Sequence, residues 1–252
     1  MNNISTHVSD GVLNVVFDRP EKKNAFTADM YAALIDVLQQ AQDNDAVRVL
    51  HMTGAGSDFT SGNDVSLFVQ AGTPGTESVA SGFMKALLAL TKPVVASVQG
   101  YAVGIGATML IHCDHVIVAA DVKLRFPFVD LGLSPEFGST ALLRSFVGRR
   151  RADEWLMLGD MIDAQAALDA GFVNAVVKSE KLQETAQQIA NQYAARPALA
   201  LQETRKLLRM QHTEQALERM AIESPLLDRL RRSEQAQGIF RQFLNRSGSK
   251  RT

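Results

Sequence analysis

Short apolar segments that alternate with helical patterns constrain the fold of this chain most strongly. Residues 47–52, 94–98 and 115–119 have the length and apolar character of buried strands. Helical patterns lie between and beside them, at 78–90 and 104–112. Because strands of four to six residues alternate with helices, the sequence predicts an α/β architecture.

The two ends of the chain differ in pattern. Asp10-Gly11 predicts a tight hairpin turn, and Thr27 is placed to cap a following helix. From about residue 180 onward the pattern is almost wholly helical, as in LQETRKLLRM. The sequence therefore predicts an α/β core at residues 1–178 and a helical C-terminal region at 179–252.

Composition excludes several classes of partner and location. A net charge of −1 gives no electrostatic footprint for nucleic acid. The single cysteine, Cys113, rules out an intrachain disulfide and fits a reducing compartment. The start MNNISTHVSDG lacks the features of a signal peptide, and no apolar run approaches the ~18 residues that span a bilayer. We expect a cytoplasmic protein without a membrane segment.

Metal and dinucleotide sites are not predicted. The five histidines are scattered and no HExxH motif occurs, so we expect no bound metal. Gly104-Ile105-Gly106 follows a strand and opens a helix, but position 109 is methionine where a dinucleotide loop has its third glycine. What such a turn does provide is unpaired backbone N–H groups that point at whatever lies in front of them.

The segment FTSGNDV, from Phe59 to Val65, has the same property. Small residues and Gly62 let a ligand approach the backbone closely, although alone the segment favours an ordinary strand–turn–helix connection. Two donor loops in one α/β chain change that interpretation, because two converging N–H groups form an oxyanion hole.

Five ordered segments resemble the crotonase (enoyl-CoA hydratase/isomerase) superfamily along nearly the whole chain. They are FDRPEKKNAF (17–26), VLHMTGAGSDFTSGNDV (49–65), KPVVASVQGYAVGIGATML (92–110), DLGLSPEFGSTALLRSFVG (130–148) and LGDMIDAQAALDAGFVNAVV (158–177). The SGND and LSPE forms are most similar to the monofunctional Δ3,Δ2-enoyl-CoA isomerases. The resemblance implies a spiral of repeated ββα units, which periodicity alone would not distinguish from a doubly wound sheet. It also implies C-terminal helices that build a homotrimer or a dimer of trimers.

The resemblance also implies a site for an acyl-CoA thioester, with no cofactor other than the CoA that the substrate carries. The backbone N–H groups of Ser61 and Ile105 would form the oxyanion hole, and Lys22 or Lys23 would contact the CoA phosphates. The basic tail around Arg246 and Lys250 resembles a part that meets the CoA of a neighbouring subunit, and the loop 71–78 would help to set acyl chain length. The implied substrate-binding residues are Lys22, Lys23, Ser61, Gly62, Asn63, Asp64, Gly104 and Ile105.

Two positions separate hydration from isomerisation. Hydratases of the family use two glutamates, whose positions here are Thr108 and Phe128. Neither residue is a base at neutral pH. The similar isomerases use one glutamate, which is Glu136 here and would move a proton from C2 to C4 through a dienolate. Without the resemblance, the position of Glu136 would favour an ordinary acidic residue in a first helical turn.

Two other functions fit the sequence. A hydratase-like, hydrolase or decarboxylase member of the family would need another catalytic side chain, such as Asp64, Thr108 or Asp130. A catalytically silent member would keep the fold and bind acyl-CoA without converting it.

Overall fold

The computed structural model describes residues 3–69 and 78–248, with side chains described up to residue 245. Most of the loop expected to set acyl chain length, residues 71–77, lies outside the described residues. The same holds for the side chains of Arg246 and Lys250 in the basic tail.

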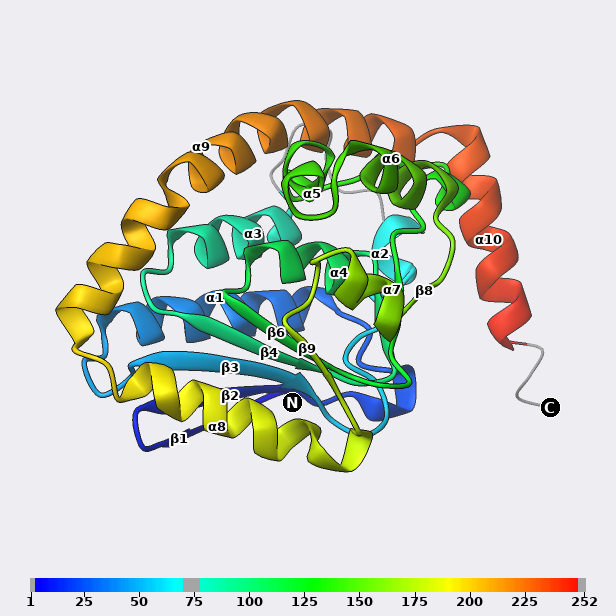
Figure 1. Ribbon diagram of the computed structural model, residues 1–252. Helices are drawn as coiled ribbons and strands as arrows, with labels where there is room; N and C mark the ends of the chain where they lie inside the picture. Colours follow the sequence, from blue (N-terminus) through cyan, green and yellow to red (C-terminus); the bar gives the residue numbers. More distant parts are fainter. Residues whose placement is uncertain (1–2, 70–77, 249–252) are drawn as a thin grey trace.

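A six-stranded sheet lies in the lower half of the molecule as seen in Figure 1. β1 and β2 are antiparallel and joined at Asp10-Gly11, where both residues have positive φ, as the hairpin prediction requires. The other pairings are parallel, and β3 and β4 are buried along their whole length. In sheet order the strands are β1 (Ile4–Ser9), β2 (Val12–Phe17), β3 (Val49–Gly54), β4 (Val94–Val98), β6 (His115–Ala119) and β9 (Ala175–Val177).

A smaller sheet produces the spiral. Its strands are β5 (Tyr101–Val103), β7 (Lys123–Arg125) and β8 (Ile162–Asp163), in that order. The chain passes from β4 to β5 and then into a short helix, and from β6 to β7 and then into another. Each unit therefore contributes one strand to each sheet before its helix, which confirms the ββα spiral. The short helices are α4 (Ile105–Thr108), η2 (Met109–His112) and η3 (Val129–Leu131).

Helices cover both faces of the main sheet. On one face α1 (Ala28–Asp43) packs against α3 (Val79–Ala89), and the Thr27 side chain caps α1 by accepting a hydrogen bond from Met30 N. On the other face α8 (Leu182–Ala194) lies beneath the strands in Figure 1. Its Leu182, Ala186 and Ala190 bury Val12, Val49, Val95, Ile117 and Ala119.

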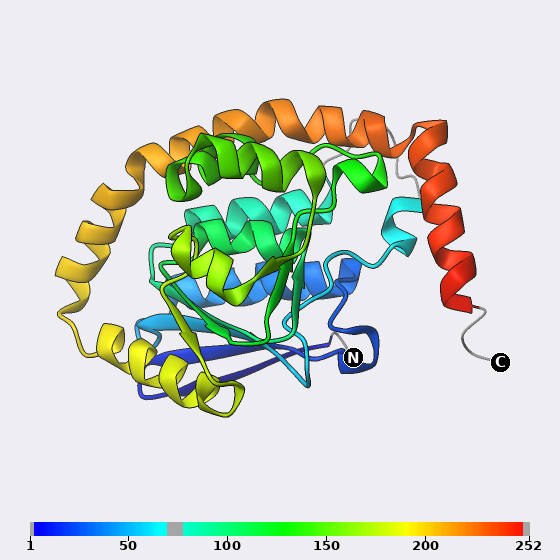
Figure 2. The same cartoon turned by 45° about the vertical axis from the view of Figure 1, so that its right-hand side comes forward.

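The C-terminal helices lie above and beside the rest of the molecule in Figure 1. The long helix α9 (Ala198–Arg231) arches over α5 (Ser139–Val147) and α6 (Arg149–Leu158), and α10 (Glu234–Gly248) turns down beside α2 (Ser66–Val69) (Figures 1 and 2). The remaining helices are η1 (Pro20–Lys22), α7 (Ala164–Asp169) and η4 (Ser179–Lys181). Across the described ranges, no helix is long and apolar enough to cross a bilayer. The boundary at residue 178 stays a prediction.

Candidate active site

The two glycine-bearing loops lie side by side. Thr60 N donates to Tyr101 O at 2.9 Å, and Val103 N donates to Thr60 O at 3.1 Å. Gly62 has a φ of +92°, and a Cβ added there would lie 2.7 Å from Val103 O. Only glycine satisfies both conditions, so the close approach of the loops depends on Gly62. The convergence of the two donor loops predicted from the sequence is thus present.

Hydrogen bonding within these loops decides which N–H groups remain for a ligand. Ser61 N donates to Lys23 O at 2.9 Å, so the expectation that Ser61 supplies the first oxyanion donor is wrong. On either side of Asn63, Phe26 N donates to Gly62 O and Asp64 N donates to Phe26 O. This parallel bridge directs the Asn63 N–H away from residue 26, and it has no acceptor among the described residues.

Ile105 supplies the second unpaired donor. It is the first residue of α4, and the first N–H groups of a helix have no partner within the helix. The neighbouring Gly104, with a φ of +58°, turns the chain into α4 and donates its own N–H to Arg125 O. Within the described part of the chain, the Ile105 N–H has no acceptor. Asn63 and Ile105, and not Ser61, therefore have backbone N–H groups without an acceptor in the described part of the chain.

Tyr31 holds the Asn63 side chain. Its hydroxyl donates to Asn63 Oδ1 at 2.5 Å from a position that is 1% exposed on α1. Burial, and secondarily the charge of Glu136, raises the pKa of Tyr31 well above its ordinary value, so the phenol stays protonated. The sequence places Tyr31 only on the apolar face of a helix, and nothing in its spacing indicates a polar role.

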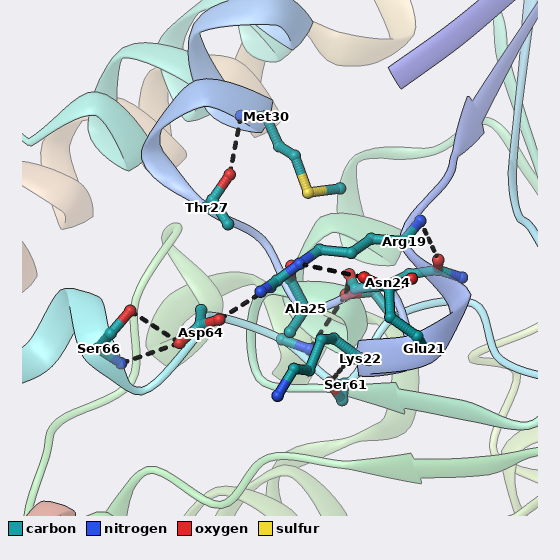
Figure 3. Close-up of polar contacts among 12 residues, drawn as sticks. Arg19, Glu21, Lys22, Asn24, Ala25, Thr27, Met30, Ser61, Asp64 and Ser66 are labelled. Carbon is teal, nitrogen blue, oxygen red and sulfur yellow. Dashed lines mark hydrogen bonds and ion pairs between the residues drawn. The ribbon is translucent and has the colours of Figure 1, made fainter. Parts of the chain in front are cut away.

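Asp64 serves the loop rather than a ligand. Arg19 Nη1 donates to Asp64 Oδ2 at 2.8 Å, and Asp64 Oδ1 accepts from Ser66 N and Oγ (Figure 3). Burial raises the pKa of Asp64, but the hydrogen bonds from Arg19 and Ser66 outweigh it and the net pKa is lowered. Arg19 also donates to Ala25 O, so one guanidinium ties the 19–25 turn to the loop.

The two lysines of the PEKK segment differ in availability. Lys23 Nζ lies 3.7 Å from Asp58 Oδ2 and 4.1 Å from the centroid of the Tyr101 ring. Both lysines are exposed, and the Lys22 carbonyl accepts a hydrogen bond from Ser61 Oγ at 3.4 Å, which places Lys22 next to the donor loop (Figure 3). Lys22 is therefore the better placed of the two for an anionic ligand.

Glu136 lies in the same cavity as Tyr31 and Asn63. The cavity has a volume of 990 Å³, and Glu136 is 8% exposed. Glu136 Oε1 is buried and accepts no hydrogen bond from any residue that the structure describes. Burial, with a further contribution from Glu223, raises the pKa of Glu136 to about 8. The apolar wall includes Ala28, Leu67, Phe68, Met84, Met220 and Leu227.

The side chains at the two hydratase positions, Thr108 and Phe128, are both buried. Thr108 is fully buried, and its hydroxyl donates to Ile105 O at 3.4 Å. Phe128 is 5% exposed. Phe137 is the chain neighbour of Glu136, whereas the Phe126 ring packs against Trp155 and Phe172. In the described segments, no group of three or more His, Cys, Asp or Glu residues is arranged to hold a metal ion.

The spiral of ββα units and the paired donor loops define a crotonase-fold protein. The chain belongs to the enoyl-CoA hydratase/isomerase family, whose model matches residues 7–249. It is 37% identical to 1,2-epoxyphenylacetyl-CoA isomerase of Escherichia coli, over 79% of this chain and 78% of that protein. It is 32% identical to crotonyl-CoA hydratase of Syntrophomonas wolfei, over 79% and 78%. A crystal structure of an enoyl-CoA hydratase/isomerase from Pseudoalteromonas atlantica superposes with a TM-score of 0.92 at 31% identity, covering 97% of each chain.

These relatives include both isomerases and hydratases at similar identity. The family acts on acyl-CoA thioesters, and membership of it supports an enzyme with a substrate of this class. The particular reaction has to be argued from the side chains in the cavity.

Proposed function

We propose that the protein is a Δ3,Δ2-enoyl-CoA isomerase that moves one proton from C2 to C4 of a 3-enoyl-CoA thioester. The observation that carries the proposal is a single buried carboxyl, Glu136, in the same cavity as Asn63, whose N–H has no acceptor among the described residues. Thr108 and Phe128 occupy the positions at which a hydratase carries its carboxylates.

The chemistry requires one base and one site for negative charge. Removing a C2 proton places charge on the thioester oxygen, and the N–H groups of Asn63 and Ile105 would stabilise it there. Glu136 would accept the proton at C2 and return it at C4. A carboxyl with a pKa of about 8 suits both steps, because it is a stronger base than an ordinary glutamate and still releases its proton near neutral pH.

Other residues support binding rather than proton transfer. Lys22 would meet the CoA phosphates, and Gly62 and Gly104 would allow the thioester to approach the backbone. The apolar wall of the cavity suits a fatty acyl chain. The reaction needs no metal or cofactor beyond the CoA of the substrate. A homotrimer or dimer of trimers and a cytoplasmic location stay predictions.

The test compares two substrates. Purified protein is incubated separately with a 3-enoyl-CoA and a 2-enoyl-CoA, and the products are separated by chromatography. We expect conversion of the 3-enoyl-CoA to the conjugated 2-enoyl-CoA, which Glu136→Gln abolishes. Hydration of the 2-enoyl-CoA at a comparable rate would favour the hydratase alternative, which the similarity to crotonyl-CoA hydratase keeps open. Binding of both esters without conversion would indicate a silent family member.

A further inference from the structure

The turn that carries Glu136 has an unusual backbone. Phe137 has a φ of +61° and the following Gly138 a φ of +72°. A bulky residue in the left-handed region is strained and persists only where surrounding contacts hold it. The position of the Glu136 carboxyl therefore depends on whatever fixes residues 137 and 138.

Glu223 on α9 supplies one of these contacts. Its Oε2 accepts from Gly138 N at 2.7 Å, while its Oε1 accepts from Thr140 N at 3.1 Å and from Thr140 Oγ1 at 2.6 Å. Gly138 precedes α5 and has no side chain with which to cap it, so Glu223 takes the place of an N-cap. The residue is 4% exposed, although glutamate is rarely buried to this degree.

His112 holds the other side of the turn without adding charge. Its Nε2 lies 2.9 Å from Phe137 O, which can only accept, so this nitrogen carries the proton. His112 Nδ1 then accepts from His212 Nε2 at 3.1 Å. Burial lowers the pKa of His112 well below its ordinary value, so the ring stays neutral.

The two buried carboxyls have opposite surroundings. Three donors converge on Glu223, and hydrogen bonds to a carboxylate favour its charged form. Glu136 Oε1 has no donor among the described residues. Burial raises the pKa of Glu223, and the hydrogen bonds from Thr140 and Gly138 and the charge of Arg219 reduce that rise without cancelling it. Because no donor reaches Glu136 Oε1, Glu223 is the better stabilised of the two as a carboxylate.

We propose that Glu223 is a positioning residue for Glu136, because its carboxylate accepts hydrogen bonds from Gly138 and Thr140 and so fixes the turn that carries the base. Besides burial, the negative charge of Glu223 on α9 raises the pKa of Glu136, while Tyr31 on α1 stays protonated and neutral. The other charged side chains that line the cavity with Glu136 are Lys85 on α3 and Asp228, Arg231 and Arg232 at the end of α9. This inference rests on the proposed proton shuttle for its purpose. Its effect on Glu136 is nevertheless a property of the protein without substrate.

The experiment measures Glu136 directly. The infrared carbonyl band of protonated carboxyl groups is followed from pH 5 to 10, and the contribution of Glu136 is assigned by its loss in Glu136→Gln. In Glu223→Gln we expect the Glu136 midpoint to fall by about one pH unit, a tenfold loss of proton affinity. The acidic limb of the pH profile of kcat/KM should move by the same amount. Thr140→Val, the matched control, removes one hydrogen bond and keeps the charge, so its midpoint should stay near the parent value.

Glu223→Asp distinguishes the effect of side-chain length from that of charge, and it provides the test if Glu223→Gln does not fold. It retains the negative charge but is one methylene shorter, so we expect a high Glu136 midpoint with kcat lowered at least tenfold. A Glu136 midpoint in Glu223→Gln equal to that of the parent, or a parental kcat in Glu223→Asp, would overturn the proposal. If the midpoint shifts as expected but no 3-enoyl-CoA is converted by the parent, the proposed function fails while the role of Glu223 stands.

Discussion

Replacing Glu136 with glutamine should stabilise the folded protein, by an amount that grows with pH. Burial raises the pKa of Glu136 from 4.5 to about 8. At about 1.4 kcal/mol per pH unit, this rise corresponds to ~5 kcal/mol between the two protonation states. Since the folded pKa lies above the unfolded one, the contribution of Glu136 to the stability of the parent is greatest below pH 4.5 and falls as pH rises to about 8.

Glutamine has the shape of the protonated carboxyl and cannot ionise, so the variant escapes this loss. Relative to the parent, we expect its free energy of unfolding to be unchanged near pH 4, higher by about 3 kcal/mol at pH 7 and by ~5 kcal/mol above pH 8. Such a gain at a catalytic group is the usual consequence of removing an unfavourable buried charge.

The assay is urea unfolding followed by circular dichroism at pH 4, 7 and 9. Protein concentration is held constant, because association would add to the apparent stability. Glu154→Gln, at an exposed position on α6, is the matched control and should show no pH-dependent gain. Equal differences between Glu136→Gln and the parent at all three pH values would refute the raised pKa and, with it, the acid–base role.

Three further substitutions test the donor pair, the CoA contact and the loop brace. Ile105→Pro removes the backbone N–H at a helix position that tolerates proline, and should lower kcat/KM about 100- to 1000-fold. Ile105→Val keeps the N–H and should retain most activity, so equal activity of the proline and valine variants would exclude the Ile105 N–H as a donor. Lys22→Ala should raise KM several-fold with little change in kcat, and this rise in KM should exceed that of Lys23→Ala, since Lys23 is engaged by Asp58. Both variants are compared by steady-state kinetics at low salt, and a larger rise in KM for Lys23→Ala would contradict the assignment. Arg19→Met leaves the Asp64 carboxylate without its ion pair and should lower the urea-derived free energy of unfolding by about 1–2 kcal/mol, because the pair is partly exposed and Ser66 still donates to Asp64. An unchanged unfolding midpoint would show that this ion pair contributes nothing to stability.

The main sheet follows from the sequence because its central strands are short, mostly apolar segments. β3 and β4 are buried throughout, so their length and composition predict them. The smaller sheet does not follow, since its strands have two or three residues and show no periodicity. Only the resemblance to a known family indicated the spiral.

The candidate site divides in the same way. Glu136 and the two donor loops are visible as motifs, but the choice between Ser61 and Asn63 depends on the bridge between residues 26 and 63. The 19–25 turn and the donor loop are far apart in the chain, so local sequence cannot reveal which N–H groups that pairing consumes. Glu223 lies 85 residues from Gly138, and on α9 it looks like any other charged residue of a long helix.

The most direct test of the central claim follows the proton itself. A 3-enoyl-CoA deuterated at C2 is converted in ordinary water, and the deuterium content at C4 of the 2-enoyl-CoA product is measured by mass spectrometry and NMR. If the buried Glu136 alone carries the proton, part of the label should appear at C4, because the carboxyl is shielded from solvent during the transfer. A product that carries no deuterium at C4, or a hydroxyacyl product, would contradict the single-base mechanism.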